Sequence, residues 1–301
     1  MGKSSDLYAR ITAEMIEGLK KGYVPWVRPW STGYYGNPQN AVSKRPYRGI
    51  NVLLLNLFGY LKHYADPRWL TFKQALHLGG CVRKGEKGSQ VVFWKQIPIN
   101  KDEDDDQDEK KTIPVARTFT VFNVEQCDGL SLDPLEPYTH ESGAVNPQAE
   151  AILSIAEIEH GGDSAHYRPS RDLICLPNRE AFADLDTYYS VGYHELVHWV
   201  GHKSRLDREL GNSRFGNQAY AFEELIAEMG AAFLGGATGL PYEKMQHPQY
   251  IASWITLLEN FHRAIFSASA QAQRAADYIL ERAGLMEEDV EVEQEEQAVA
   301  A

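Results

Sequence analysis

The sequence predicts an α+β protein of two domains, a small basic α+β domain followed by a mainly helical one. The 301 residues are enough to bury two hydrophobic cores. Short helical and strand patterns fill residues 1–130, whereas longer helical patterns follow after residue 148. The charge also changes sign along the chain: residues 1–99 hold 15 Lys and Arg against 5 Asp and Glu, although the net charge is −12.

The N-terminal domain, residues 1–130, is expected to combine short helices with one pair of strands. Apolar residues recur every three or four positions, which predicts helices at 6–21, 52–60 and 69–76. β-Branched and aromatic residues predict strands at 91–95 and 118–124, which we expect to pair with each other. Residues 101–111 contain seven acids and no apolar side to bury, so we expect a mobile loop there.

The C-terminal domain is expected over residues 148–285, after a linker at 131–147 that is rich in turn-forming residues. A helix is expected at 148–159, and two short strands with a turn at Pro169 are expected within 164–177. Longer helical patterns are expected at about 193–202, 220–234, 251–258 and 268–282. The tail at 286–301 contains seven acids and no basic residue, so we expect it to be disordered.

The most informative stretch runs from Tyr193 to His202 and reads YHELVHWVGH. His194 and His198 are four residues apart, so they share one face of a helix and can take two corners of a metal site. Glu195 directly follows the first histidine, where it could act as general base on a water molecule that the metal activates. The alternative is an ordinary helix with histidines on its polar face.

A metal site of this kind needs a third protein ligand. The metzincin arrangement fails because Ser204 stands where its third histidine would be. Glu224 and Glu228 lie four apart on an apolar helix, where buried carboxylates need a cationic partner. We assign Glu224 as the ligand and Glu228 as a carboxylate that orients a histidine, although the two roles could be exchanged. Glu223 is expected to be exposed.

The metal is expected to be one divalent ion. Two histidines and a carboxylate suit zinc best, although manganese or iron could occupy the same ligands. Structural zinc sites have four protein ligands, whereas this sequence offers three good candidates. Three candidate ligands favour a catalytic metal site, which keeps an open coordination position, over a structural metal site.

Basic and aromatic residues alternate in the first half of the chain, which predicts contact with single-stranded DNA. Lysine and arginine neutralise phosphates, and exposed rings stack on unpaired bases. The rings at 69, 93, 94, 119 and 122 are expected to lie in the core instead. The candidate DNA-binding residues are Lys21, Trp26, Arg28, Trp30, Tyr34, Tyr35, Lys44, Arg45, Tyr47, Arg48, Arg83, Lys84 and Lys87.

The remaining composition gives expectations about the compartment. Cys81, Cys127 and Cys175 show no paired spacing, so we expect buried, reduced thiols in the cytoplasm. No apolar run is long enough to span a membrane. The N-terminus lacks the apolar segment of a signal peptide.

The chain resembles the ArdC antirestriction proteins of conjugative plasmids over about residues 6–285. The stretch RPYRGIN at 45–51 and the segment at 120–123 resemble their single-stranded-DNA-binding domain, which is shared with TraC-type plasmid primases. The segments at 194–202 and 223–228 resemble their zincin-like metallopeptidase domain, of the HExxH type.

The resemblance implies a protein that binds incoming single-stranded plasmid DNA and protects it from restriction endonucleases. The alternative is an active zinc metallopeptidase that cleaves a host or nuclease protein and uses DNA binding for localisation. Its peptide substrate would lie along the strand at 172–176. A primase activity is not expected, because the sequence shows no separate catalytic domain with clustered acidic metal ligands.

Overall fold

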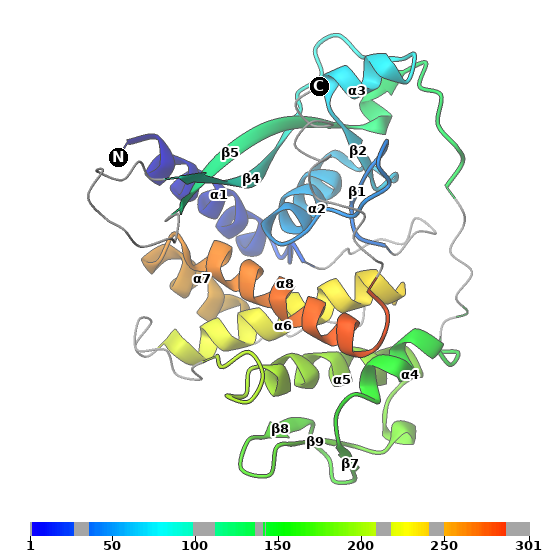
Figure 1. Cartoon of the computed structure of the whole chain (residues 1–301), viewed down its shortest axis with the longest axis vertical. Coiled ribbons are helices and arrows are strands. Elements are labelled where there is room, and N and C mark those ends of the chain that lie inside the picture. The colour runs from blue at the N-terminus through cyan, green and yellow to red at the C-terminus, as the bar shows by residue number, and fades with distance from the viewer. Residues whose placement is uncertain are drawn as a thin grey trace, which may run out of the picture.

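The computed structural model describes residues 2–26, 36–98, 112–135, 141, 143–208, 218–240 and 250–286. The predicted loop at 101–111 and the acidic tail from residue 287 lie outside these ranges. Residues 136–140 and 142 of the predicted linker also lie outside them. The fold is α+β, with an N-terminal part of mixed helices and strands beside a mainly helical C-terminal part (Figure 1).

The N-terminal part is built on a four-stranded sheet in the order β1-β2-β5-β4. A long antiparallel ribbon dominates it, formed by β4 (Ser89–Pro98) and β5 (Thr112–Asn123). The predicted strands at 91–95 and 118–124 pair as expected, although both are longer than predicted. Strand β2 (Arg68–Leu70) pairs antiparallel with β5, and β1 (Gln39–Asn40) pairs parallel with β2. A second, two-stranded sheet joins β3 (Cys81–Val82) to β6 (Cys127–Asp128).

Three helices accompany these strands, and the third differs from the prediction. They are α1 (Gly2–Lys20), α2 (Ile50–Lys62) and α3 (Phe72–His77). The helix predicted from residue 69 is wrong at its start, because Trp69 and Leu70 belong to β2. Helix α3 begins where Thr71 forms a capping box with Gln74, so the local cap decides the boundary between strand and helix.

The C-terminal part begins with α4 (Pro147–Leu153) and a sheet in the order β7-β9-β8. Its strands are β7 (Ile158–His160), β8 (His166–Arg168) and β9 (Leu173–Leu176). The helix predicted to reach residue 159 is therefore too long, because its last residues form β7. The long helices are α5 (Leu185–Val200), α6 (Ala219–Thr238), α7 (Ile251–Asn260) and α8 (Ala264–Arg282).

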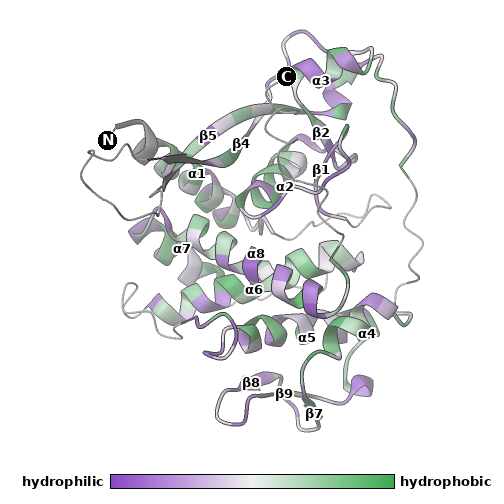
Figure 2. Cartoon of the chain, viewed as in Figure 1, coloured by the Kyte–Doolittle hydropathy of each residue, from purple (hydrophilic) through white to green (hydrophobic). Residues whose placement is uncertain are grey.

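The two parts share one hydrophobic core. Helices α1 and α2 lie against α7 and α8 (Figure 1), and one cluster of buried side chains runs from Ile11 through Leu53 to Ala272. Helices α2 and α6 are among the most hydrophobic segments in Figure 2. The ring of Trp26 meets that of Trp254 edge to face, with centroids 5.2 Å apart. The parts are thus joined by apolar packing as well as by the chain.

Some expectations about the fold are corrected. Cys175 is buried, but Cys127 is half-buried and Cys81 is exposed, so the three cysteines are not all buried; all three are free thiols. Trp94, which we expected in the core, is 45% exposed. Among the described residues, no helix combines the length and apolar character needed to cross a membrane.

Candidate metal centre

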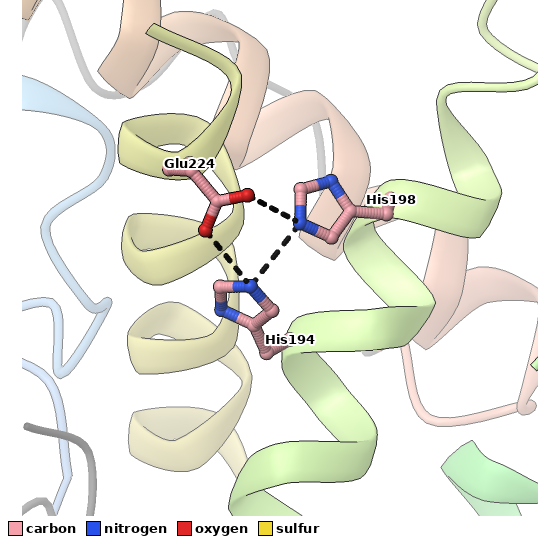
Figure 3. A group of neighbouring side chains, drawn as sticks. All are labelled: His194, His198 and Glu224. Carbon is pink, nitrogen blue, oxygen red and sulfur yellow. Dashed lines mark hydrogen bonds and ion pairs between the residues drawn. The ribbon is translucent and has the colours of Figure 1, made fainter. Parts of the chain in front are cut away.

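Two adjacent helices carry the predicted metal ligands. His194 and His198 project from α5, and Glu224 projects from α6 toward both of them (Figure 3). Gly230 lets the helices approach closely, because a Cβ atom at this position would lie 2.7 Å from Cγ2 of Val197. Asp184 caps the start of α5 by accepting a hydrogen bond of 2.9 Å from the Thr187 amide.

The Nε2 atoms of both histidines face Glu224. The two Nε2 atoms are 3.1 Å apart, and they lie 3.5 Å and 3.6 Å from the carboxylate oxygens of Glu224. One ligand atom from each residue falls within 4.8 Å of the others. Two imidazole nitrogens and a carboxylate arranged in this way suit a divalent transition-metal ion, so the residues fit the predicted cofactor.

The Nδ1 atoms of the histidines face two other glutamates of α6. Oε1 of Glu228 lies 3.2 Å from Nδ1 of His194, and Oε1 of Glu223 lies 3.1 Å from Nδ1 of His198. Carboxylates at Nδ1 orient a metal-binding imidazole and leave its Nε2 free for the metal. This geometry favours Glu224 as the ligand and Glu228 as the orienting carboxylate, as the sequence analysis assigned them.

Glu223 was expected to be exposed, but this prediction is wrong, because the residue is only 9% exposed. Arg208, from the loop after α5, donates a hydrogen bond of 2.7 Å to Glu223 and another to the Val197 carbonyl. Burial alone would raise the pKa of Glu223, but the hydrogen bond with His198 and the charge of Arg208 outweigh it and lower that pKa. Glu223 is therefore charged and holds His198, which its position in the sequence did not indicate.

Burial alone would lower the pKa of His194, but hydrogen bonds to Glu224 and Glu228 raise it to about 10. Burial alone would raise the pKa of Glu224, but contacts with His194 and His198 lower it. Glu223 and Glu224 thus carry negative charge beside the histidines. A divalent cation would meet a strongly anionic cluster once His194 loses its proton.

The predicted general base, Glu195, is buried beside the same cluster and is held by a backbone group. Its Oε2 accepts a hydrogen bond of 2.7 Å from the amide of Tyr167 in β8. The hydroxyl of Tyr167 donates to Asp172 at 2.7 Å, and Arg205 binds both oxygens of Asp172. Arg205 also lies over the ring of Trp199, 3.8 Å from its centroid, so β8 is fastened to α5.

An open cavity of about 660 Å³ adjoins these residues. Its walls come from β8 and the turn after it, from α5 and α6, and from Tyr250. His194, Glu195, His198 and Glu224 all line it. A ligand or substrate could therefore reach the predicted ligands and the predicted base from the same side.

Two tyrosines at this cavity were not predicted. The hydroxyl of Tyr220 is hydrogen-bonded to Glu224 and lies 3.1 Å from the hydroxyl of Tyr250. The ring of Tyr250 stacks at 5.9 Å on Trp254, which also contacts Trp26. Helical spacing could have indicated Tyr220, because it is four residues before Glu224 on the same helix.

We expect Tyr220→Phe to lower the affinity for a divalent ion by about tenfold, because Glu224 loses a hydrogen bond that fixes its carboxylate. Competition with a chromophoric chelator measures this change. Tyr278→Phe is the matched control, since Tyr278 lies on α8 and its hydroxyl accepts a hydrogen bond from the exposed Arg282, away from the metal-site residues. Equal metal affinities for Tyr220→Phe and the wild type would show that the hydroxyl does not position Glu224.

The predicted DNA-binding residues are dispersed and partly engaged. Arg28, Trp30, Tyr34 and Tyr35 lie outside the described residues. The prediction for Trp26 is wrong, because its ring is 1% exposed and packs on Trp254. Arg45 and Tyr47 are half-buried, and the exposed members of the set are Lys21, Lys44, Arg48, Arg83, Lys84 and Lys87.

Two exposed arginines of this set have acidic partners. Arg48 forms an ion pair of 2.5 Å with Asp277 of α8, and Arg83 contacts Glu86 and Asp128. Lys44 lies 3.4 Å from Asp133, but both side chains are highly exposed, so this pair is weak. His202, four residues past His198, contacts Ser204 at 2.8 Å and, within the described part of the chain, forms no hydrogen bond or ion pair with His194, His198 or Glu224.

Comparisons with known proteins match both parts of the chain. Residues 5–122 match the family model of the N-terminal domain of anti-restriction factor ArdC. Residues 147–271 match the model of a zincin-like metallopeptidase. The chain is 40% identical over 293 residues to a DNA primase TraC of Escherichia coli, of which it spans 27%. It is 38% identical to the uncharacterized protein y4eC of Sinorhizobium fredii, with 91% of this chain and 92% of that protein covered.

Solved structures agree with these matches. The metal-free crystal structure of the antirestriction ArdC protein from the R388 plasmid has a TM-score of 0.77 and 38% sequence identity, covering 94% of this chain and 99% of that one. The Mn(II)-bound structure of the same protein has a TM-score of 0.75. The bound ion in that relative and the cluster found here agree on a single divalent metal ion. The chain therefore belongs to the ArdC antirestriction family and carries a zincin-like metal centre.

Proposed function

We propose that the protein binds single-stranded DNA with its N-terminal part and thereby protects incoming plasmid DNA from restriction endonucleases. The observation that carries this proposal is the match to the R388 ArdC protein along nearly the whole of both chains. The charge distribution supports it, because residues 1–99 have 15 basic residues against 5 acidic ones. An excess of basic residues attracts phosphates, so the N-terminal part can bind DNA although the whole chain has a net negative charge.

Binding of labelled oligonucleotides across a salt series tests this proposal. We expect higher affinity for a single strand than for a duplex of the same sequence, because rings can stack only on unpaired bases. We also expect the affinity to fall as salt rises, since bound cations are released from the phosphates. Equal affinity for both forms, or no dependence on salt, would contradict the proposal.

A metallopeptidase activity is the second candidate, and the open cavity beside Glu195 favours it. A divalent ion held by His194, His198 and Glu224 would supply Lewis acidity and lower the pKa of a water molecule. Glu195 would accept the proton from that water, because the Tyr167 amide fixes its carboxylate at the cavity. The ion in this proposal is zinc or manganese.

The proposed peptide-binding strand is corrected. The sequence analysis placed the substrate along 172–176, but β9 is the central strand and pairs with both β7 and β8. Its backbone groups are already engaged. We propose β8 instead, because it is an edge strand of this sheet and its residues His166 and Tyr167 line the cavity. The Tyr167 amide would not pair with the peptide, because it already donates to Glu195.

We expect Glu195→Gln to reduce any peptide cleavage by a factor of about 10² to 10⁴, because the amide cannot accept the proton. The variant should bind the metal like the wild type, since Glu195 is not among the clustered ligand atoms. Cleavage is measured on a denatured protein substrate, with metal content determined in parallel. Cleavage at the wild-type rate would remove Glu195 from the mechanism.

The same variant tests whether protection needs proteolysis. A fragment such as 1–130 is unsuitable, because α1 and α2 share their core with α7 and α8. Full-length Glu195→Gln keeps this core. Undiminished protection of incoming DNA by this variant would make proteolysis dispensable, whereas loss of protection would favour the second function.

The TraC relatives give no support for a priming activity here. The chain spans 27% and 19% of the two TraC primases that it matches. Within the described ranges, His194, His198 and Glu224 are the one group of side chains with metal-ligand geometry.

A further inference from the structure

We infer that single-stranded DNA contacts one face of the β4–β5 ribbon, through Phe93, Phe119, Arg117 and Lys95. This inference rests on the proposed DNA binding and names its surface. None of these four residues was among the predicted DNA contacts, and the two phenylalanines were expected to lie in the core.

The strand register places the four residues on one face. Val91 is opposite Phe119, Phe93 is opposite Arg117, and Lys95 is opposite Val115. Residues directly opposite each other in an antiparallel pair point to the same side of the sheet. Every second pair therefore belongs to this face, which we call the Phe119 face.

Burial decreases along the Phe119 face. At its inner end, Val91 and Val121 are buried against Leu55 and Trp69. Farther out, Phe93 and Phe119 are only partly buried, and Arg117 is exposed. The outer half of the face is thus accessible, whereas its inner half is fixed to the core and keeps the ribbon in place.

The two phenyl rings form a platform. Their centroids are 5.4 Å apart and their planes meet at 81°, so one ring presents its edge to the other. Each ring keeps an exposed portion on which an unpaired base can stack. A duplex offers no such base, because its bases are stacked on each other, so the platform favours a single strand.

The charge of the ribbon matches a phosphate backbone. Neither β4 nor β5 contains Asp or Glu, and the acidic run lies in the connection between them, outside the described residues. Among the described residues Arg117 has no ion pair or hydrogen bond, unlike Arg48 and Arg83. Its guanidinium is available for a phosphate next to the bases that stack on the rings.

The opposite face of the ribbon is less suitable. Val92 is buried in the main core, and Ala116 packs against the same core. The ring of Trp94 lies 6.2 Å from that of Tyr8 on α1. The free edge of β4 is also closed at Val92, because the Asn51 side chain bonds both its amide and its carbonyl. Trp94 is itself 45% exposed, but no basic residue of β4 or β5 shares its face. The Phe119 face is therefore the side of the ribbon on which rings and basic residues lie together.

Two full-length variants test this assignment with a labelled oligothymidylate across a salt series. Arg117→Gln should weaken binding and reduce the slope of log affinity against log salt by about 0.7, the value for one lost phosphate contact on a single strand. Phe119→Leu should weaken binding by about fivefold or more and leave the slope unchanged, because it removes stacking and no charge. Arg282→Gln, an exposed charge removal on α8, is the control and should bind like the wild type.

Circular dichroism and thermal unfolding show whether each variant is folded. Because Arg117 is exposed and Phe119 is half-buried, we expect Arg117→Gln to disturb the fold less than Phe119→Leu. Unchanged affinity and slope in both variants, with tight binding by the wild type, would overturn the Phe119 face and leave the proposed DNA binding intact. A wild-type protein that does not bind the oligonucleotide would overturn both.

Discussion

Replacing His198 with alanine is expected to lower the affinity for a divalent ion by about a hundredfold to a thousandfold. A complete set of four zinc ligands contributes roughly 10–16 kcal/mol of apparent binding free energy, so one ligand accounts for about 3–4 kcal/mol. His198 supplies Nε2 to the cluster and is held there by Glu223. Calorimetric titration with Mn(II) or Zn(II) measures the loss.

Glu195→Gln is the matched control, because it changes a neighbouring buried residue of the same helix and removes no ligand atom from the cluster. It should keep wild-type affinity. Thermal unfolding of metal-free His198→Ala shows whether the variant is folded. If folded His198→Ala binds the ion as tightly as the control, His198 is not a ligand.

Protons are expected to compete strongly with the metal ion. The pKa of His194 is raised to about 10 in the metal-free protein by its hydrogen bonds to Glu224 and Glu228, which outweigh burial. A metal ligand must be the neutral imidazole, so binding releases this proton. Apparent affinity should therefore rise about tenfold per pH unit, or about a hundredfold between roughly pH 6.5 and 8.5.

The stability of the metal-free fold should change in the opposite direction. A raised pKa in the folded state stabilises the fold below the ordinary histidine pKa, and this contribution is lost as the pH rises toward about 10.

Titrations of the protein with the metal ion, in buffers of different ionisation enthalpy, count the protons that metal binding releases. An affinity that is flat over this pH range would show that His194 is already neutral before the metal binds.

The prediction of the inner metal site rested on helical spacing. His194 and His198, and likewise Glu224 and Glu228, are four residues apart, so helix formation alone places each pair on one face. The structure brings the two faces together. What local spacing could not show is the role of Glu223, which depends on Arg208 arriving from a loop between the helices.

Non-local pairing explains the other differences. The local sequence around Trp69 and Leu70 fits a helix. These two residues form a strand instead, because they pair with residues 123 and 122, more than fifty positions away. The burial of Trp26 likewise depends on a distant residue, because its ring packs on Trp254 in the other half of the chain. Composition predicted that rings and basic residues would meet in the N-terminal part, but only the ribbon register shows which of them share an accessible face.

The two halves are also more closely connected than the predicted linker implies. Trp26 contacts Trp254, Trp254 stacks on Tyr250, and the Tyr250 hydroxyl meets that of Tyr220 beside Glu224. The N-terminal part therefore contributes to the packing that surrounds the metal centre. Variants of the full chain are for this reason the appropriate material for both proposed functions.

Anomalous diffraction from crystals grown with Mn(II) or Zn(II), with data collected on both sides of the metal's absorption edge, tests the central claim most directly. We expect one strong peak among Nε2 of His194, Nε2 of His198 and the carboxylate of Glu224, with Glu228 and Glu223 still facing the Nδ1 atoms. A peak bound by other residues, or its absence from this cluster in metal-saturated crystals, would contradict the account.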